Sequence, residues 1–207
     1  GTVDRAYNLN WTNVALAEKL ARKINKPIKV SNDANCAALG ETMFGVGRMY
    51  SDTIFITLGT GVGGGVILDN KLYEGNESKG GELGHMVLVV DGEPCTCGRN
   101  GCMEAYCSAS ALIRETKCAM LANKDSEMWK FSPSLADVDG KTAFECSKKG
   151  DKAAIGVVEY FVKYLGEGML NFANIFRPQA IILGGCVCAQ GDYLIDKLKD
   201  YCKDRNY

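Results

Sequence analysis

Residues 53–73, TIFITLGTGVGGGVILDNKLY, carry the strongest indication of the fold. Thr53 to Leu58 is apolar and β-branched, which is typical of a buried strand. The glycine-rich run from Gly59 to Gly65 then leads into a second apolar stretch, Val66 to Leu68. Asp69-Asn70 joins that stretch to a third short strand, because such a pair between apolar runs favours a tight turn. We therefore expect a hairpin built around a glycine turn.

Helical spacing of apolar residues occurs on both sides of this hairpin. Before it, the pattern predicts a helix from Val14 to Ile24, a short strand from Ile28 to Ser31, and a second helix that starts at Asp33. After it, the predicted helices cover Met103 to Ala122, Thr142 to Lys148, Asp151 to Phe176 and Tyr193 to Lys203, with a buried strand from Gln179 to Leu183. Strands that alternate with helices predict an α/β fold.

The composition bounds the class of protein. The chain has 207 residues, 46% hydrophobic and 24% charged, which is enough to bury the core of one large domain or two small lobes. The formal net charge is −1 and no Lys/Arg run stands out, so neither a nucleic acid nor an anionic membrane is expected as a partner. No apolar stretch approaches the roughly 20 residues of a transmembrane helix.

Ten cysteines are present, and seven of them stand singly in apolar segments. Single cysteines in such segments favour buried, reduced thiols, and hence a cytoplasmic protein. These seven are Cys36, Cys107, Cys118, Cys146, Cys186, Cys188 and Cys202.

The other three cysteines cluster with the single histidine of the chain. His85, Cys95, Cys97 and Cys102 fall within 18 residues of a glycine-rich loop, which cannot bury a core of its own. Structural zinc prefers four tetrahedral N/S ligands, and a Cys3His set leaves no open position for water. The sequence therefore predicts a structural zinc ion. The alternatives are that the thiols are incidental or that two of them form a disulfide, which for Cys-x-Cys would close a strained ring.

The glycine run lies between two predicted strands, whereas P-loop and Rossmann fingerprints both open a helix. Glycines let backbone N–H groups approach a phosphate closely, and the Thr60 hydroxyl can donate a further hydrogen bond. A second glycine pair, Gly184-Gly185, ends the late strand at the edge where α/β sheets bind ligands. The pattern favours a phosphate-binding hairpin; the alternative is a glycine run that serves only tight sheet packing.

Five motifs, taken together, are similar to one known family. They are Asn32-Asp33-Ala34-Asn35, the turn from Leu58 to Gly65, Gly81-Glu82-Leu83-Gly84-His85, Cys95-x-Cys97-Gly98-x-x-Gly101-Cys102-x-Glu104, and Leu183-Gly184-Gly185. In this order and spacing they resemble the ROK family, which contains bacterial sugar kinases and sugar-responsive repressors. The resemblance covers nearly the whole chain.

The resemblance implies an actin-like ATPase fold, with two ribonuclease-H-like lobes around a cleft, of which residues 1–207 would supply mainly the second lobe and the zinc loop. It implies that Asp33 is the general base. It also implies ATP and Mg²⁺ as cofactors, a hexose as substrate and a homodimer. The implied sugar ligands are Asn32, Asp33, Glu82, His85 and Glu104, and the implied nucleotide-binding residues are Thr60, Gly61, Gly63, Gly184 and Gly185.

Without the resemblance, several of these residues have plainer explanations. An Asp where a strand becomes a helix is more often an N-cap. Glu82 and Glu104 would more often be solvated charges of a loop. His85 would serve twice, with one ring nitrogen on zinc and the other facing the sugar.

The sequence also departs from the family. The Asp-x-Gly-Gly-Thr phosphate segment and the alanine- and glycine-rich C-terminal segment are not found. We therefore expect a fragment that lacks the N-terminal lobe and the extreme C-terminus and has little or no kinase activity by itself. Cys186 stands where the family continues its glycine run, so we expect an altered fit of the adenine.

Two functions of different classes follow. The first is ATP-dependent phosphorylation of a hexose, with glucose to glucose 6-phosphate as first choice, because Gly101 to Tyr106 resembles the family's glucokinases. The second is the effector-binding domain of a sugar-responsive repressor. A zinc-stabilised domain without catalysis is a third, plainer reading.

Overall fold

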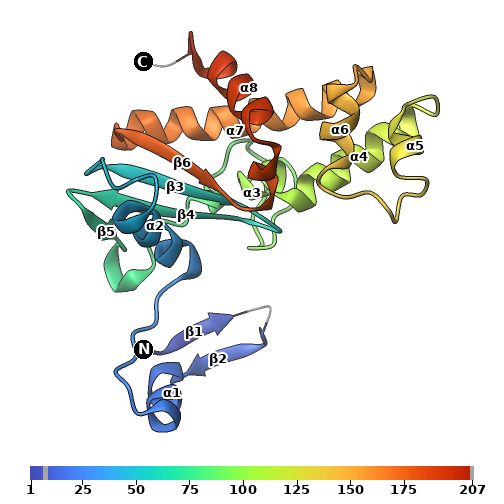
Figure 1. The fold of residues 1–207 in the computed structure, drawn as a ribbon. Helices are drawn as coiled ribbons and strands as arrows, with labels where there is room; N and C mark the ends of the chain where they lie inside the picture. The colour runs from blue at the N-terminus through green and yellow to red at the C-terminus, as the bar shows by residue number, and fades with distance from the viewer. Residues whose placement is uncertain (7–8, 206–207) are drawn as a thin grey trace.

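The computed structural model describes residues 1–6 and 9–205 and has an α/β fold around a mixed four-stranded sheet (Figure 1). The strand order is β5-β4-β3-β6, in which β3 pairs antiparallel with β4 and parallel with β6. The strands are β3 (Thr53–Leu58), β4 (Val62–Leu68), β5 (Lys71–Tyr73) and β6 (Ala180–Gly184). The predicted hairpin is confirmed, and its Asp69-Asn70 turn has both residues at positive φ.

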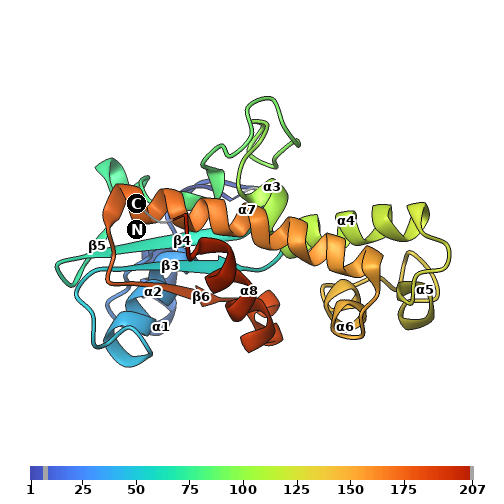
Figure 2. The same ribbon diagram turned by 90° about the horizontal axis from the view of Figure 1, so that it is seen from above.

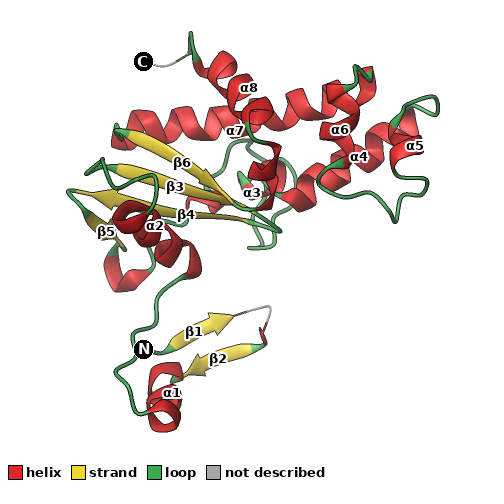
Figure 3. Cartoon of the chain, viewed as in Figure 1, coloured by secondary structure: helices red, strands yellow, loops and turns green. Residues whose placement is uncertain are grey.

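Helices cover both faces of this sheet (Figures 1, 2 and 3). Helix α2 (Asp33–Phe44) lies on one face, where Phe55 of β3 packs with Ala38. Helix α7 (Lys152–Phe176) lies on the other face, in the cluster that also holds Ile54 and Ile56. Because alternate residues of a strand point to opposite faces, the continuous apolar run of β3 serves both layers.

The helices that follow the hairpin in sequence extend the layer of α7. They are α3 (Glu104–Cys107), α4 (Ala109–Ala122), α5 (Met128–Phe131), α6 (Thr142–Lys148) and α8 (Asp192–Cys202). Phe144 of α6 meets Phe161 of α7 edge to face, with ring centroids 6.2 Å apart. Among the described residues, no helix is both long enough and apolar enough to cross a bilayer.

The N-terminal part forms a small unit below the sheet in Figure 1. Strand β1 (Val3–Ala6) pairs antiparallel with β2 (Trp11–Val14), and α1 (Leu16–Ile24) follows. An ion pair of 3.3 Å between Lys79 Nζ and Asp4 Oδ2 links β1 to the loop that follows β5.

Two predicted elements differ in the structure. The strand expected from Ile28 to Ser31 is wrong, because this segment is irregular and no described strand pairs with it. Apolar residues make a strand only where a partner supplies hydrogen bonds. The single helix expected from Met103 to Ala122 is divided at Ser108, whose extended backbone ends α3 and whose hydroxyl accepts a hydrogen bond from Ala111 N, capping α4.

All ten cysteines are free thiols, but not all of the single ones are buried. Cys107 and Cys146 are buried as predicted, whereas Cys36, Cys118 and Cys186 are exposed. An apolar segment can leave one side of a helix in solvent, so the apolar neighbours of these cysteines in sequence did not reveal their exposure.

Candidate functional site

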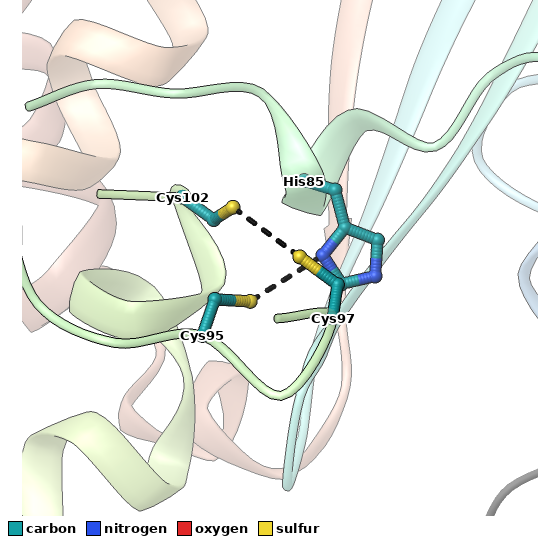
Figure 4. Close-up of side chains that lie close together, drawn as sticks. All are labelled: His85, Cys95, Cys97 and Cys102. Atoms are coloured by element: carbon teal, nitrogen blue, oxygen red, sulfur yellow. Dashed lines mark hydrogen bonds between the residues drawn. The ribbon is translucent and has the colours of Figure 1, made fainter. Parts of the chain in front are cut away.

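One histidine nitrogen and three cysteine sulfurs meet in the segment from His85 to Cys102, here called the cysteine loop (Figure 4). All four ligand atoms lie within 4.8 Å of one another. His85 Nδ1 is 3.5 Å from Cys95 Sγ, and Cys97 Sγ is 3.7 Å from Cys102 Sγ. Two sulfurs bonded at about 2.3 Å to one tetrahedral zinc ion are about 3.8 Å apart. The donor set and its spacing therefore fit a tetrahedral metal ion.

Short-range backbone contacts hold the cysteine loop in this shape. Cys95 N donates to Arg99 O at 2.8 Å, and Gly98 N donates to Cys95 O at 3.0 Å, which closes a tight turn around Cys97. Gly98 has a φ of +88°, a value that glycine adopts without strain. Cys102 pairs with Val87 in an isolated bridge, which brings the last cysteine back beside His85.

The three thiols differ in their acidity. Burial raises the pKa of Cys95 to about 12 and also raises the pKa of Cys102. A backbone hydrogen bond from Arg99 lowers the pKa of the exposed Cys97. Since metals bind thiolates, a metal ion at this site would replace the thiol protons of its cysteine ligands.

Glu104, the first residue of α3, connects the cysteine loop to the sheet. Its Oε2 accepts a hydrogen bond from the backbone N–H of Val62 at 3.1 Å. Its Oε1 accepts from the hydroxyl of Thr96 at 2.7 Å. Neither Val62 nor Thr96 was among the predicted site residues. Thr96 stands visibly between two cysteines in the sequence, but its contact with Glu104 depends on the fold.

The glycine turn, Gly59 to Gly61, docks on the start of α4. Gly59 O accepts from Ala109 N, and Thr60 O accepts from the Ser110 hydroxyl, each at 2.8 Å. These contacts hold the two carbonyl groups toward the protein. The side chain of Thr60 is exposed at the tip and is free to meet a ligand.

The remaining glycines of the run lie within β4, where close neighbours leave no space for a side chain. A Cβ on Gly63 would lie 2.9 Å from the Cβ of Ala34 in α2, and a Cβ on Gly64 would lie 2.7 Å from Leu83 on the opposite face. A Cβ on Gly65 would collide with Ala38. Close packing therefore accounts for these three glycines, and a phosphate contact of Gly63 stays a prediction.

The two predicted glycine motifs come together in the structure. Gly184 pairs with Thr57 at the carboxyl ends of the parallel strands β3 and β6. Gly185 has a φ of +91°, and a Cβ there would collide with the backbone of Leu58. The turn after β3 and the turn after β6 thus share one edge of the sheet, where α/β proteins bind ligands. Cys186 follows at this edge, with its thiol 3.6 Å from Leu58 O.

Asp33 is not the N-cap of α2. Asn32 takes that role, because its Oδ1 accepts from Ala34 N at 2.9 Å and from Asn35 N at 3.1 Å. The Asp33 carboxylate is exposed in the first turn, where it accepts from Ala34 N. The N-cap role that was the simpler alternative for Asp33 therefore belongs to Asn32. The Asp33 carboxylate is accessible to solvent. The amide NH2 of Asn32 is likewise left to donate outward.

Strand β4 lies between the helix that starts at Asp33 and the turn that ends at His85. The first turn of α2 packs on Gly63 through Ala34, while the 3-10 turn Leu83–His85 packs on Gly64 through Leu83. Glu82, just before that turn, is exposed and makes no side-chain hydrogen bond within the described residues. His85 Nδ1 faces the cysteines, and its other ring nitrogen points away from them (Figure 4).

Two cavities lie near these elements, and they differ in character. An apolar groove of about 530 Å³ runs beside the edge strand β6, and none of the predicted site residues lines it. A polar cavity of about 390 Å³ opens beside Asn32, between β1 and the loop after β5. Its lining includes Ser31, Ser78 and Lys79, whose polar groups suit a polyhydroxylated ligand.

Comparison with known proteins identifies relatives of two kinds. The model of the ROK family matches residues 1–206. A glucokinase of Thermotoga maritima is 34% identical over 99% of this chain, and a xylose repressor of Caldicellulosiruptor bescii is 31% identical over 100% of it. The chain spans 67% of that glucokinase and 52% of that repressor.

A solved structure agrees with this assignment. The crystal structure of a ROK family glucokinase from Streptomyces griseus, in complex with glucose and AMPPNP, superposes with a TM-score of 0.88 at 36% identity. The match covers 97% of this chain and 65% of that protein. This neighbour confirms the predicted actin-like ATPase fold.

Proposed function

Because the chain belongs to the ROK family, we propose that the whole protein is an ATP-dependent hexose kinase. Glucose, converted to glucose 6-phosphate, is the proposed substrate. The relatives named glucokinase and the glucose complex of the Streptomyces griseus structure support this choice. Residues 1–207 would supply mainly the second lobe and the cysteine loop of the whole protein.

In the proposed reaction, a hydroxyl oxygen of the hexose attacks the γ-phosphorus of ATP and ADP leaves. Asp33 accepts the hydroxyl proton, so the nucleophile gains charge as the new P–O bond forms. Asn32, Glu82, His85 and Glu104 bind other hydroxyls of the sugar. The observation that carries this proposal is that Asn32 caps α2 and leaves the neighbouring carboxylate exposed.

The nucleotide is proposed to bind at the shared edge of β3 and β6. Thr60, Gly61 and Gly63 would face its phosphates from one turn, and Gly184 and Gly185 from the other. The meeting of these turns at Thr57 and Gly184 supports this position. Mg²⁺, bound with ATP, would supply neutralisation of phosphate charge during transfer.

We propose zinc as the metal of the cysteine loop, held by His85, Cys95, Cys97 and Cys102. Its role is structural, because four protein ligands leave no position for water. The ten free thiols of the chain fit a reducing, cytoplasmic setting. A homodimer of the whole protein is part of the same proposal.

A coupled assay of ADP release on the whole protein, across a panel of hexoses, tests the proposed activity. Asp33→Asn should lower kcat by roughly 10²–10⁴-fold, the usual contribution of a general base, while ATP still binds. A variant with wild-type turnover would remove Asp33 from the mechanism. The sequence contains no Asp-x-Gly-Gly-Thr segment, so residues 1–207 alone should show little turnover in the same assay.

The second candidate is the effector-binding domain of a sugar-responsive repressor, which the 31% identity to a xylose repressor favours. The same cysteine loop and sugar ligands would then bind an inducer. Gel-shift titration of the whole protein against promoter DNA, with and without sugar, tests this function. Sugar-dependent release from DNA without ADP production would select the repressor over the kinase.

A further inference from the structure

The Glu104 carboxylate joins two segments that carry most of the proposed site. Oε2 accepts from the N–H of Val62, the first residue of β4, at 3.1 Å. Oε1 accepts from the Thr96 hydroxyl, in the middle of the cysteine loop, at 2.7 Å. Each bond has a charged acceptor, and such bonds are stronger than bonds between neutral groups. One side chain therefore ties the cysteine loop to the start of the glycine strand.

The surroundings of Glu104 leave room for this contact. A Cβ on Gly61 would collide with Oε2, so only glycine at position 61 lets the carboxylate reach Val62 N. The backbone of Glu104 is anchored by the buried residues Ala105, Tyr106 and Cys107 that follow it in α3. With the backbone held, the direction of the carboxylate depends on its hydrogen-bond donors.

Two donors of the cysteine loop face Oε1, and they differ in strength. The Cys95 thiol lies 3.5 Å from Oε1, and the Thr96 hydroxyl lies 2.7 Å from it. A thiol is a weak donor, whereas a hydroxyl at this distance makes a normal hydrogen bond. The Thr96 hydroxyl is therefore the main donor of the cysteine loop to Oε1.

We propose that Thr96 is a positioning residue, whose hydroxyl orients the Glu104 carboxylate toward the start of β4 and toward the sugar. The sugar part of this inference rests on the proposed function. The link from Thr96 through Glu104 to Val62 does not, because both of its hydrogen bonds join residues of this chain to one another. Thr96 is exposed, so the inference concerns orientation and not core packing.

The test compares Thr96→Val, which removes the hydroxyl, with Thr96→Ser, which keeps it, in the zinc-loaded whole protein. Thr96→Val should raise the KM for glucose about tenfold and change kcat less than twofold, because it loosens a group that binds substrate and transition state alike. Without sugar, the backbone amide of Val62 should exchange its hydrogen about fivefold faster by NMR. Thr96→Ser should restore both values to within about twofold.

The outcomes separate this inference from the proposed function. If the wild-type protein phosphorylates no hexose, the kinase proposal fails, and amide exchange at Val62 still tests the bridge. Unchanged exchange at Val62 in Thr96→Val overturns the inference, as does an unchanged KM in an active enzyme. Loss of bound zinc from Thr96→Val also overturns the inference, because the role of Thr96 would then be to stabilise the metal site and not to orient Glu104.

Discussion

The cysteine loop and strand β4 are neighbours held by different interactions. The loop keeps its shape through near-sequence contacts such as Cys95 N to Arg99 O, and these contacts bring its three sulfurs together. β4 depends on elements far away in sequence, because α2 and the turn at Leu83 press on its glycines from both faces. We therefore expect the cysteine loop to depend on a bound metal ion for its stability. We expect β4 to depend on the small size of its glycines.

The largest expected effect is loss of the metal from the cysteine loop. Cys97→Ser should abolish stoichiometric zinc binding and destabilise the protein by several kcal/mol, since structural zinc contributes folding free energy directly. A strong chelator should act on the wild type in the same way. Metal analysis of the purified protein and its thermal midpoint measure both effects.

Cys118→Ser is the matched control for this prediction. Cys118 is also exposed and free, but it lies in α4 outside the metal cluster. This variant should keep its zinc and its thermal midpoint. Full zinc content in Cys97→Ser would show that the thiols do not act as one ligand set.

The next effect tests the packing of β4. Gly65→Ala should cost about 1–3 kcal/mol of unfolding free energy, because the new methyl group would overlap Ala38 and overpack the interface with α2. Urea denaturation followed by circular dichroism measures the loss. A Gly65→Ala protein as stable as the wild type would mean that α2 can move away from the sheet without penalty.

A smaller effect is expected where the cysteine loop meets the core. The Tyr106 hydroxyl accepts from Glu93 N at 2.8 Å, and its ring stacks on Tyr164 with centroids 4.4 Å apart. Tyr106→Phe removes the hydrogen bond and keeps the stacking, so it should cost about 1 kcal/mol. Thermal unfolding measures it against Tyr50→Phe, a change at an exposed residue that should have no effect. A loss of several kcal/mol would show that the loop depends on this one bond.

The smallest effect has the opposite sign. Gly40 lies within α2, two residues after Ala38, which contacts Gly65. A Cβ on Gly40 would meet nothing within 4 Å. Gly40→Ala should therefore stabilise the protein by up to about 1 kcal/mol, through the better helix propensity of alanine. The same urea titration serves as the measurement. Destabilisation would contradict the open space at Gly40 and weaken the contrast with Gly65.

Much of the fold could be predicted because its signals are local. The β-branched run at Thr53 to Leu58, the Asp69-Asn70 turn and the apolar spacing of Asp151 to Phe176 each specify an element within a few residues. The strand predicted from Ile28 to Ser31 is wrong for the complementary reason, since a strand needs a partner and no described strand pairs with this segment.

The same division applies to the candidate site. The proximity of His85 to the three cysteines could be predicted from the sequence, because 18 residues rich in glycine leave them little room to separate. The sequence also placed Asp33 at the start of a helix. These outcomes depend on short stretches of backbone, whose geometry the local sequence restricts.

Contacts between residues far apart in sequence became visible only in the folded chain. The bond from Val62 N to Glu104 spans 42 residues, and the contact of Gly185 with Leu58 joins two turns that are farther apart still. Such contacts arise when whole elements pack to bury their apolar faces, a condition that no short window of sequence contains. The packing of β4 likewise explains why Gly63, Gly64 and Gly65 have no side chain, which the sequence pattern alone did not decide.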